Sequence, residues 1–255
     1  MSKIEWTQKT WNPVTGCTKV SAGCKNCYAE RMANRLKHIG VTEYKNGFQV
    51  ACHPHKLDEP KKRKKPTVWF VNSMSDLFHE SIPEKFVDDV IETCRQTPRH
   101  IYQILTKRPE AMRDYFKEKS VPNNVWLGVS VENRKHGVPR IDVLRQIKCA
   151  PRRFLSCEPL LEDLGNLNLS GIDWVICGGE SGPGARPMNK EWVMKIRWQA
   201  GRRGISFFFK QWGAWGEDGV RRDKAKNGRT LNGHTYDEMP MLPYAFTDDH
   251  RPINI

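Results

Sequence analysis

Short apolar segments that alternate with amphipathic stretches restrict the fold of this chain more than any other feature. The apolar segments are rich in β-branched and aromatic residues and nearly continuous in hydrophobicity, as expected of strands covered on both faces. They span 67–73, 100–106, 124–130, 152–158, 173–179 and 205–211, and residues 4–16 are a candidate for a still earlier strand. The stretches between them have the period of helices, at 28–37, 83–96, 109–119, 137–148 and 189–204.

This alternation predicts parallel strands joined by right-handed crossovers. Six or seven strand–helix units indicate an α/β fold, a full or partial (β/α) barrel of the TIM type, with a doubly wound open sheet as the alternative. We expect the barrel to occupy residues 1–215. After Trp212 the sequence becomes rich in Gly, Pro and charge, so residues 216–255 are expected to form an irregular tail or lid.

Each predicted strand turns polar at its carboxyl-terminal end. These ends are Ser73–Asp76, Thr106–Arg108, Ser130–Asn133, Ser156–Glu158, Gly178–Ser181 and Lys210–Trp212. Any strand must leave a sheet through a polar loop, but the recurrence of Ser, Glu and Lys favours a lined pocket at one mouth of a barrel. We count Ser130 and Glu132 among the candidates for binding a cofactor there.

The charge of the chain indicates a polyanionic partner. The net charge is +13, and the run KKRKK at 61–65 is compact; both favour nucleic acid or a nucleotide-like substrate. The sequence contains no run of 18 apolar residues and no apolar segment near its start, so we expect no membrane span, no secretory signal and a cytoplasmic location.

Three of the eight cysteines, Cys17, Cys24 and Cys27, have the spacing C-x6-C-x2-C. In a reducing compartment such thiols are more often metal ligands than disulfides. Three thiolates could hold a [4Fe–4S] cluster and leave its fourth iron open. A structural zinc ion would need a fourth ligand, for which the nearby candidates are His38, Cys52, His53 and His55. The third interpretation is that the thiols are buried or incidental.

The segment CTKVSAGCKNCYAERMA resembles the cluster loop of radical S-adenosylmethionine (SAM) enzymes, and its Cys27-Tyr28 ending is similar to that of spore photoproduct lyase and related DNA-repair lyases. Over residues 6–215 the chain also looks like a family of uncharacterised gene products of phages, prophages and bacteria. The matching segments are WNPVTGCTKVSAGCKNCYAERMA, VNSMSDLFHE, QILTKRPE, GVSVEN, SCEPLLEDL, GGESGPGARPM and KQWGAW.

The resemblance implies an enzyme in which Cys17, Cys24 and Cys27 bind a [4Fe–4S] cluster and Tyr28 lies near the cofactor. Such an enzyme takes an electron from an external donor and cleaves SAM to a 5′-deoxyadenosyl radical. The repair-lyase likeness implies modification or repair of nucleic acid or a nucleotide, in a bacterium or a phage-infected host. Oligomeric state stays open.

The sequence departs from the radical SAM pattern in three places. The first cysteine spacing is six residues rather than three, and Asn26 stands where an aromatic or apolar residue is usual. The Gly178-Gly179-Glu180 segment looks like the SAM-binding Gly-Gly-Glu but follows a late strand. The place after strand two is held by Ser73, Ser75 and Asp76, which we favour for the SAM amine, with Glu180 facing the substrate or ribose.

The resemblance also implies roles for residues nearer the substrate. Spore photoproduct lyase uses a cysteine as a hydrogen donor, so Cys157, beside Glu158, or Cys177 are candidates for that catalytic role, although a cysteine in a strand is more often a core residue. Candidates for holding phosphates are Lys107, Arg108, Arg186, Lys210 and KKRKK, and candidates for stacking a base are Trp212 and Trp215.

Two alternatives involve no catalysis. One is a nucleic-acid-binding phage protein with a structural zinc or cluster site. The other is a host-directed phage effector that uses the fold without chemistry. A closed site with four metal ligands would favour the first, whereas an open metal position beside a SAM pocket would favour the enzyme.

Overall fold

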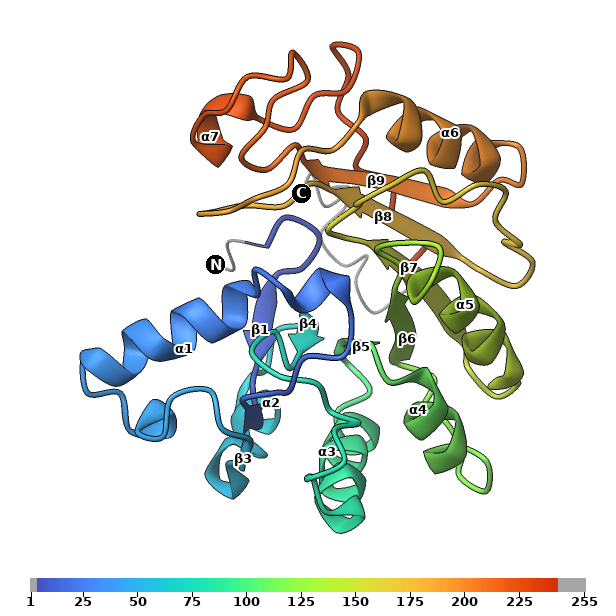
Figure 1. Cartoon of the computed structure of the whole chain (residues 1–255). Helices are drawn as coiled ribbons and strands as arrows, with labels where there is room; N and C mark the ends of the chain where they lie inside the picture. Colours follow the sequence, from blue (N-terminus) through green and yellow to red (C-terminus); the bar gives the residue numbers. More distant parts are fainter. Residues whose placement is uncertain (1–3, 243–255) are drawn as a thin grey trace.

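The computed structural model of the protein describes residues 4–242 and contains one curled parallel sheet with helices on its outer side (Figure 1). Seven strands pair in the order β1-β4-β5-β6-β7-β8-β9, every pair parallel. The strands are β1 (Lys9–Trp11), β4 (Val68–Val71), β5 (Ile101–Thr106), β6 (Val125–Ser130), β7 (Arg152–Cys157), β8 (Trp174–Gly178) and β9 (Ser206–Gln211). This sequential order confirms the predicted α/β fold in its partial-barrel form, because a doubly wound sheet would reverse direction at a switch point.

The helices are α1 (Tyr28–His38), α2 (Glu59–Lys62), α3 (Glu84–Gln96), α4 (Pro109–Tyr115), α5 (Gly137–Gln146), α6 (Lys190–Gly201) and α7 (Lys224–Asn227). All except the short α2 and α7, which were not predicted, lie close to their predicted positions. Pro109 occupies the first turn of α4, where its missing N–H costs no hydrogen bond. Asn189 caps α6 by accepting a hydrogen bond from the Glu191 backbone N–H at 2.8 Å.

A small antiparallel pair, which the sequence pattern did not indicate, lies outside the main sheet. It joins β2 (Val14–Thr15) to β3 (Ala51–Cys52). Three short 3-10 helices, at Ala22–Cys24, Thr42–Tyr44 and Pro54–Lys56, lie in the irregular stretches before β4. The first strand is shorter than the predicted segment 4–16, because pairing with β4 covers only Lys9–Trp11.

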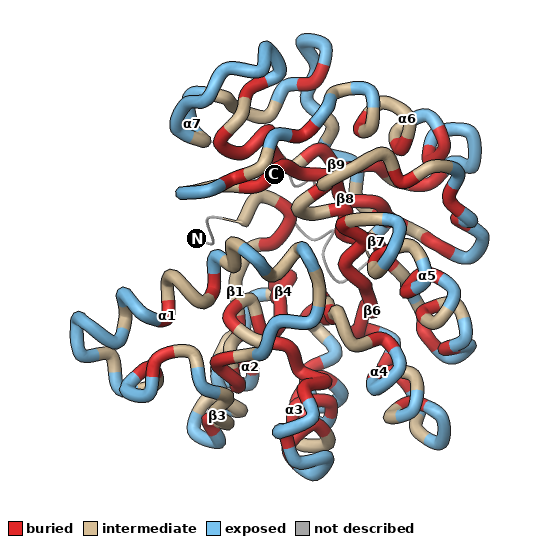
Figure 2. The backbone as a smooth tube through the Cα atoms, in the orientation of Figure 1, coloured by how far each residue is buried: buried red, intermediate tan, exposed pale blue. Residues whose placement is uncertain are grey.

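The sheet separates two apolar clusters of buried side chains. Figure 2 shows that the strands between them are mostly buried. Aromatic residues fill the inner side of the curl, where Trp6 lies 4.6 Å from Phe70 and 6.0 Å from Trp174 between ring centroids. Gly128 makes room for this packing, because a Cβ there would lie 2.4 Å from the Phe154 ring. The interior of the curl is therefore a packed core, and the space for a ligand inside the curl lies at its mouth.

Residues 216–242, the described part of the predicted tail or lid, pack beside β8 and β9. The Trp174 indole N–H donates to the Glu238 carbonyl at 2.8 Å, and Leu231 is fully buried. The rest of the predicted extension, 243–255, lies outside the described residues. Within residues 4–242, no helix has the length and apolar character needed to cross a membrane.

Candidate functional site

A cavity of about 810 Å³ opens at the carboxyl-terminal ends of the strands. All three cysteines of the predicted cluster motif line it, together with eleven other residues singled out from the sequence. These eleven are Tyr28, Ser73, Ser75, Asp76, Lys107, Arg108, Ser130, Glu158, Gly179, Glu180 and Lys210. The structure therefore brings these residues together at one cavity, most of them from the predicted polar strand ends.

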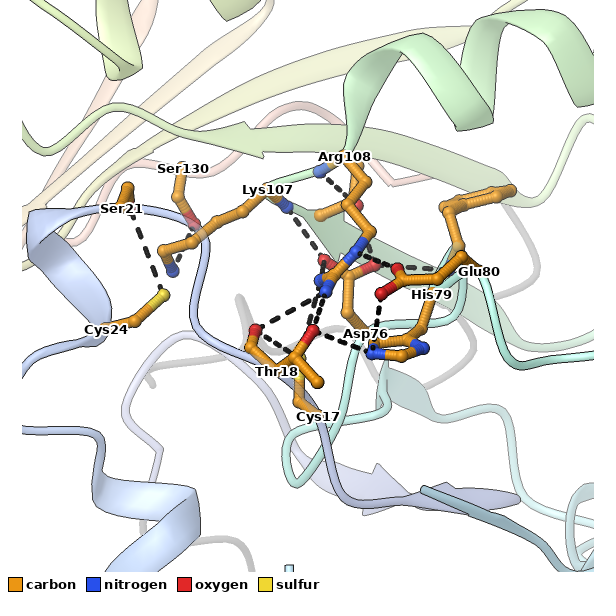
Figure 3. A network of polar contacts seen from close by, with 12 residues as sticks. Cys17, Thr18, Ser21, Cys24, Asp76, His79, Glu80, Lys107, Arg108 and Ser130 are labelled. Atoms are coloured by element: carbon orange, nitrogen blue, oxygen red, sulfur yellow. Dashed lines mark hydrogen bonds and ion pairs between the residues drawn. The ribbon is translucent and has the colours of Figure 1, made fainter. Parts of the chain in front are cut away.

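Arg108 ties the cysteine loop, residues 17–27, to the ends of β4 and β5 (Figure 3). Its guanidinium donates to Thr18 Oγ1 at 2.8 Å, to Asp76 Oδ2 at 3.3 Å and to Cys17 Sγ at 3.4 Å. Glu80 also pairs with it, at 3.1 Å. Since the Arg108 side chain is only 10% exposed, these partners compensate a largely desolvated charge.

Asp76 is held by four hydrogen bonds. Thr106 Oγ1 donates to it at 2.6 Å, the Lys107 backbone N–H at 3.0 Å and the Phe78 backbone N–H at 3.1 Å, besides Arg108. Asp76 is 5% exposed. Its carboxylate therefore orders the β4 and β5 ends, and the polar groups of this predicted segment that are only half-buried are the hydroxyls of Ser73 and Ser75.

A second attachment of the cysteine loop runs through Glu132. This carboxylate is fully buried, pairs with Arg140 at 2.6 Å and accepts a hydrogen bond from Ser21 Oγ. Burial on its own raises the pKa of Glu132, but the positive charges of Lys107 and Arg140 outweigh it and hold the pKa below its ordinary value. Glu132 does not line the cavity; it supports the loop that does.

A third attachment joins the loop to the segment after β8. Arg186 forms a two-pronged pair with Glu180, at 2.6 Å and 2.9 Å, and donates to the Ala22 carbonyl at 3.0 Å. Asn26 donates to Glu180 Oε2 at 3.1 Å and to the Gly184 carbonyl at 2.8 Å. Glu180 and Arg186, predicted to meet ligand groups, thus pair with each other and hold the residues around the cysteines.

Two of the thiols, Cys17 and Cys24, have pKa shifts of opposite direction. Burial raises the pKa of Cys17, and the charge of Asp76 adds to this, while Arg108 lowers it in part. Burial acts in the same direction on Cys24, but the charge of Lys107 and hydrogen bonds at Val20 and Ser21 bring its pKa below the ordinary value. Lys107 in turn donates to Ser130 Oγ at 3.1 Å.

Cys17, Cys24 and Cys27 line one cavity. Within residues 4–242, no three His, Cys, Asp or Glu side chains converge closely enough for one metal ion. A cubane would take its three thiolates on three different irons, whereas a structural zinc ion would need four ligands around one point.

The candidate fourth ligands for zinc have other partners. His53 Nε2 lies 2.8 Å from Thr15 Oγ1, His55 lies 3.6 Å from Glu43, and His38 Nδ1 lies 2.6 Å from the Asn34 carbonyl. Cys52 lies in β3, paired with Val14. None of these four residues lines the cavity that holds the three thiols.

At the β7–β9 side of the cavity, Lys210 and Glu158 form an ion pair across β8. Their charged atoms lie 2.6 Å apart, and the side chains are 14% and 19% exposed. Gly178 lies beneath them, with its hypothetical Cβ 3.4 Å from Glu158 Cδ and from Lys210 Cβ. Gln211, which the sequence analysis placed in the polar strand end Lys210–Trp212 without assigning it a role, donates to Ser181 Oγ at 3.0 Å. Its buried Oε1 has no partner among the described residues.

The structure does not bring Cys157 or Trp212 to the cavity. Cys157 is fully buried in the layer between sheet and helices, beside Cys177 in the register of β7 and β8; Ser156, its neighbour on the other face, lines the cavity instead. Trp212 is 1% exposed, and its indole N–H donates to the Thr230 carbonyl at 2.6 Å. Trp215 donates to the Ala185 carbonyl at 2.7 Å.

Several supporting residues were not predicted. Asn12 Oδ1 accepts hydrogen bonds from Ser73 Oγ and the Met74 backbone N–H, both at 3.2 Å. His79 Nε2 lies 2.9 Å from Thr18 Oγ1. The residues of each of these pairs are 61 or 62 positions apart in the chain, so only the assembled fold brings them together. The signal in the sequence that pointed to His79 was its place in the segment VNSMSDLFHE.

Solved structures with a similar arrangement are those of spore photoproduct lyase. A variant with bound AdoMet and dinucleoside spore photoproduct is 13% identical, with a TM-score of 0.41 over 76% of this chain and 61% of that one. The complex with dinucleoside spore photoproduct is 12% identical, with a TM-score of 0.43 over 74% of this chain and 59% of that one. Another variant is 12% identical, with a TM-score of 0.47 over 79% of this chain and 64% of that one. The chain thus spans under two thirds of the length of these proteins.

Comparison of the sequence with known proteins gives a match to a family. No curated protein matches the sequence. One family matches residues 1–240, a span that holds the whole sheet, the cysteine loop and the cavity; its description is "Protein of unknown function (DUF5131)". The chain belongs to this DUF5131 family.

Proposed function

We propose that the chain is a radical SAM-type [4Fe–4S] enzyme that acts on nucleic acid or a nucleotide-like substrate, in modification or repair. The observation that carries the proposal is the shared cavity: the three thiols of the resembling motif line it together with the hydroxyls of Ser73 and Ser75. Cys17, Cys24 and Cys27 would hold the cluster, and the Ser73–Asp76 segment would face the SAM amine.

Bound together, the cluster and SAM would supply radical chemistry through reductive cleavage of SAM, with the electron from an external donor. The chain's own residues hold and shield the reacting parts. Three attachments, through Arg108, Glu132 and Glu180, fix the cysteine loop. This preorganisation matters because a reactive species must meet its target in a fixed geometry and away from water.

The opposite side of the cavity is suited to the substrate. Glu158, Lys210 and Gln211 present acceptors and a cation there, and the Gln211 Oε1 needs a hydrogen-bond donor because burial without one is costly. A nucleobase edge supplies such donors, and the chain's net charge of +13 favours a polyanion. These features support a nucleotide unit as substrate in the cytoplasm of a bacterium or phage-infected host.

The test is anaerobic reconstitution with iron and sulfide, followed by ultraviolet–visible and EPR spectroscopy with and without SAM. We expect a reduced cluster signal that shifts when SAM is added, because SAM would occupy the open iron. Cys17→Ala, Cys24→Ala and Cys27→Ala should each lose most of the bound iron. Cys149→Ala is the matched control, since Cys149 is exposed and remote from the cavity lining.

The alternative is a non-catalytic nucleic-acid-binding protein with a structural zinc. A protein that purifies colourless with one tightly bound zinc ion, and takes up no cluster, would overturn the enzyme proposal and leave this alternative. An iron cluster whose EPR signal does not change when SAM is added would also contradict the enzyme proposal, because an unchanged signal would indicate a cluster site closed to SAM.

A further inference from the structure

A second hollow, distinct from the cysteine cavity, lies beside the edge strand β1. Its volume is about 670 Å³, and its lining is strongly basic. The lining residues are Lys9, Thr10, Glu59, Lys62, Arg63, Lys64, Lys65 and Trp69, which we call the basic hollow. It contains four of the five residues of the KKRKK run, a motif that the cysteine cavity leaves unused.

The positive charge of the basic hollow is largely uncompensated. Among the described residues, Lys9, Lys62, Lys64 and Lys65 have no ion-pair partner. The acidic residue of the lining, Glu59, is itself paired with Lys56 at 3.4 Å. Like charges held together in a concave site repel one another, and an anionic ligand relieves that repulsion.

The basic segment is held in place by the fold. Arg99 donates to the Arg63 carbonyl at 2.9 Å and to the Lys61 carbonyl at 2.8 Å, and His100 Nε2 lies 3.0 Å from the Pro60 carbonyl. These contacts, from residues just before β5, fix the backbone of the segment against the sheet. A fixed array of cations binds an anion at a lower entropic cost than a free tail does.

Trp69 gives independent evidence for a ligand. It lines the basic hollow, is only 5% exposed, and its indole N–H has no acceptor among the described residues. Lys9 Nζ lies 5.8 Å from the centre of the Trp69 ring. An unpaired buried donor beside free cations needs an acceptor, and an anionic oxygen satisfies both.

The basic hollow adjoins the cysteine cavity. Thr10, in the middle of β1, lines both. The basic segment ends at Lys65, before the first residue of β4, whereas the cavity is lined by Phe70 in β4 and by the segment that follows this strand. The length of the four-residue strand is about 13 Å, which roughly four stacked nucleotides cover.

We propose that the basic hollow binds phosphates of the sugar–phosphate backbone of a nucleic acid strand, one nucleotide of which enters the cysteine cavity. The substrate is then a polymer rather than a free nucleotide. This inference rests on the proposed function for the choice of substrate, but binding itself requires neither reductant nor SAM, so the two are tested separately.

The experiment measures binding of fluorescent single-stranded oligonucleotides to the full chain, purified anaerobically, by anisotropy over a series of salt concentrations. The variant is the triple change Lys62→Gln, Lys64→Gln and Lys65→Gln. We expect affinity to fall roughly tenfold or more and the salt slope to weaken by about 2, because each single-strand phosphate contact contributes about 0.7. Trp69→Phe should lower affinity without changing the slope, because it removes a neutral donor.

The matched control removes the same charge elsewhere, through Lys45→Gln, Lys117→Gln and Lys148→Gln. These lysines are exposed and have no ion-pair partner among the described residues. An equal loss in both triple variants would overturn the proposal, because it would show only a general effect of charge. The affinity for mononucleotides should be the same in wild type and in the triple variant of the hollow. The affinity for oligonucleotides longer than about six nucleotides should be lower in that variant.

Two further outcomes would contradict the proposal. If the triple variant keeps its oligonucleotide affinity and loses binding to vesicles of phosphatidylcholine and phosphatidylglycerol, the hollow recognises lipid phosphate. If it loses only inorganic phosphate binding, the hollow is a site for a small anion. A failed cluster reconstitution with intact hollow-dependent binding would overturn the proposed function alone.

Discussion

Asn26, which stands between Cys24 and Cys27, donates a hydrogen bond to Glu180 Oε2 over 3.1 Å. The same oxygen accepts hydrogen bonds from the backbone N–H of Arg186 and from the Nε–H of the Arg186 side chain, both at 2.9 Å. The position of the cysteine pair therefore depends on a carboxylate that follows β8, 154 residues further along the chain.

Replacing Glu180 by Gln tests this dependence. The amide keeps the shape but loses the charge that pairs with Arg186, in a site where the carboxylate is 5% exposed. We expect the free energy of unfolding to fall by about 1–3 kcal/mol, and the iron bound per chain after reconstitution to fall with it. Urea unfolding and iron analysis measure the two effects.

The control for Glu180→Gln is Glu118→Gln, since Glu118 is exposed and has no ion-pair partner among the described residues. It should leave both quantities unchanged. Full iron content in Glu180→Gln would show that the loop keeps its position without this carboxylate.

The adjacent glycines of the Gly-Gly-Glu segment should respond differently to Ala. At Gly179 a Cβ would lie 1.9 Å from the Trp212 carbonyl oxygen, which is backbone and cannot move aside. At Gly178 the nearest atoms are at 3.4 Å, an ordinary contact. We expect Gly179→Ala to lower the free energy of unfolding by about 3 kcal/mol or more and Gly178→Ala by less than about 1 kcal/mol. Similar urea midpoints for the two variants would contradict this reading of the segment.

The sequence predicted the fold and the cavity lining because both depend on local signals. Strands covered on both faces are continuous apolar runs, and their carboxyl ends meet at one mouth whatever the details of packing. The three cysteines carry their own spacing. The strand pattern and the cysteine spacing can both be read without knowing which residues distant in the chain are in contact.

The partners of the charged site residues required the assembled fold. Glu180 was predicted to face a ligand because of the Gly-Gly-Glu resemblance, and Arg186 because of its positive charge. Although the two residues are only six positions apart, their pairing and the link of Glu180 to Asn26, 154 residues earlier, become visible only in the assembled fold. The orientation of Cys157 was missed for a different reason. The segment FLSC is buried on both faces of the sheet, so its alternation offers only one polar residue, Ser156, to indicate which face meets the cavity.

Cys24 should be more reactive than Cys17 in the cluster-free protein. Despite burial, the charge of Lys107 and hydrogen bonds at Val20 and Ser21 lower the pKa of Cys24, whereas burial and Asp76 raise that of Cys17. The thiolate is the reactive form, so we expect iodoacetamide at neutral pH to label Cys24 several-fold faster. Mass spectrometry of the labelled peptides measures the order, and faster labelling of Cys17 would refute it.

Lys107→Met separates the effect of charge from that of access. Without the cation, the pKa of Cys24 should rise and its labelling should slow. Lys148→Met, which removes an exposed lysine outside the cavity lining, should not change the rate. Equal rates in both variants would mean that exposure alone governs the reactivity of this thiol.

Because of Glu132, part of the free energy of unfolding should depend on pH in the acidic range. Although burial opposes ionisation, Lys107 and Arg140 hold its pKa in the folded protein below the ordinary 4.5. A depressed pKa stabilises the folded state above the unfolded-state pKa, and this stabilisation is lost as the pH falls through 4.5 toward the lower folded-state value. In that window the free energy of unfolding should drop by up to about 1.4 kcal/mol per pH unit on account of this one group.

Glu132→Gln isolates that contribution. At neutral pH the variant should be less stable by about 3 kcal/mol or more, because Arg140, whose side chain is 7% exposed, loses its charged partner. As the pH falls below about 4.5, wild type loses the stabilisation that the variant never had, so the two urea-unfolding curves should converge. Glu118→Gln should instead follow wild type at every pH. A difference between wild type and Glu132→Gln that stays constant from neutral pH to acid would show that Glu132 keeps an ordinary pKa, and that Ser21 and the cysteine loop are held by its shape rather than by its charge.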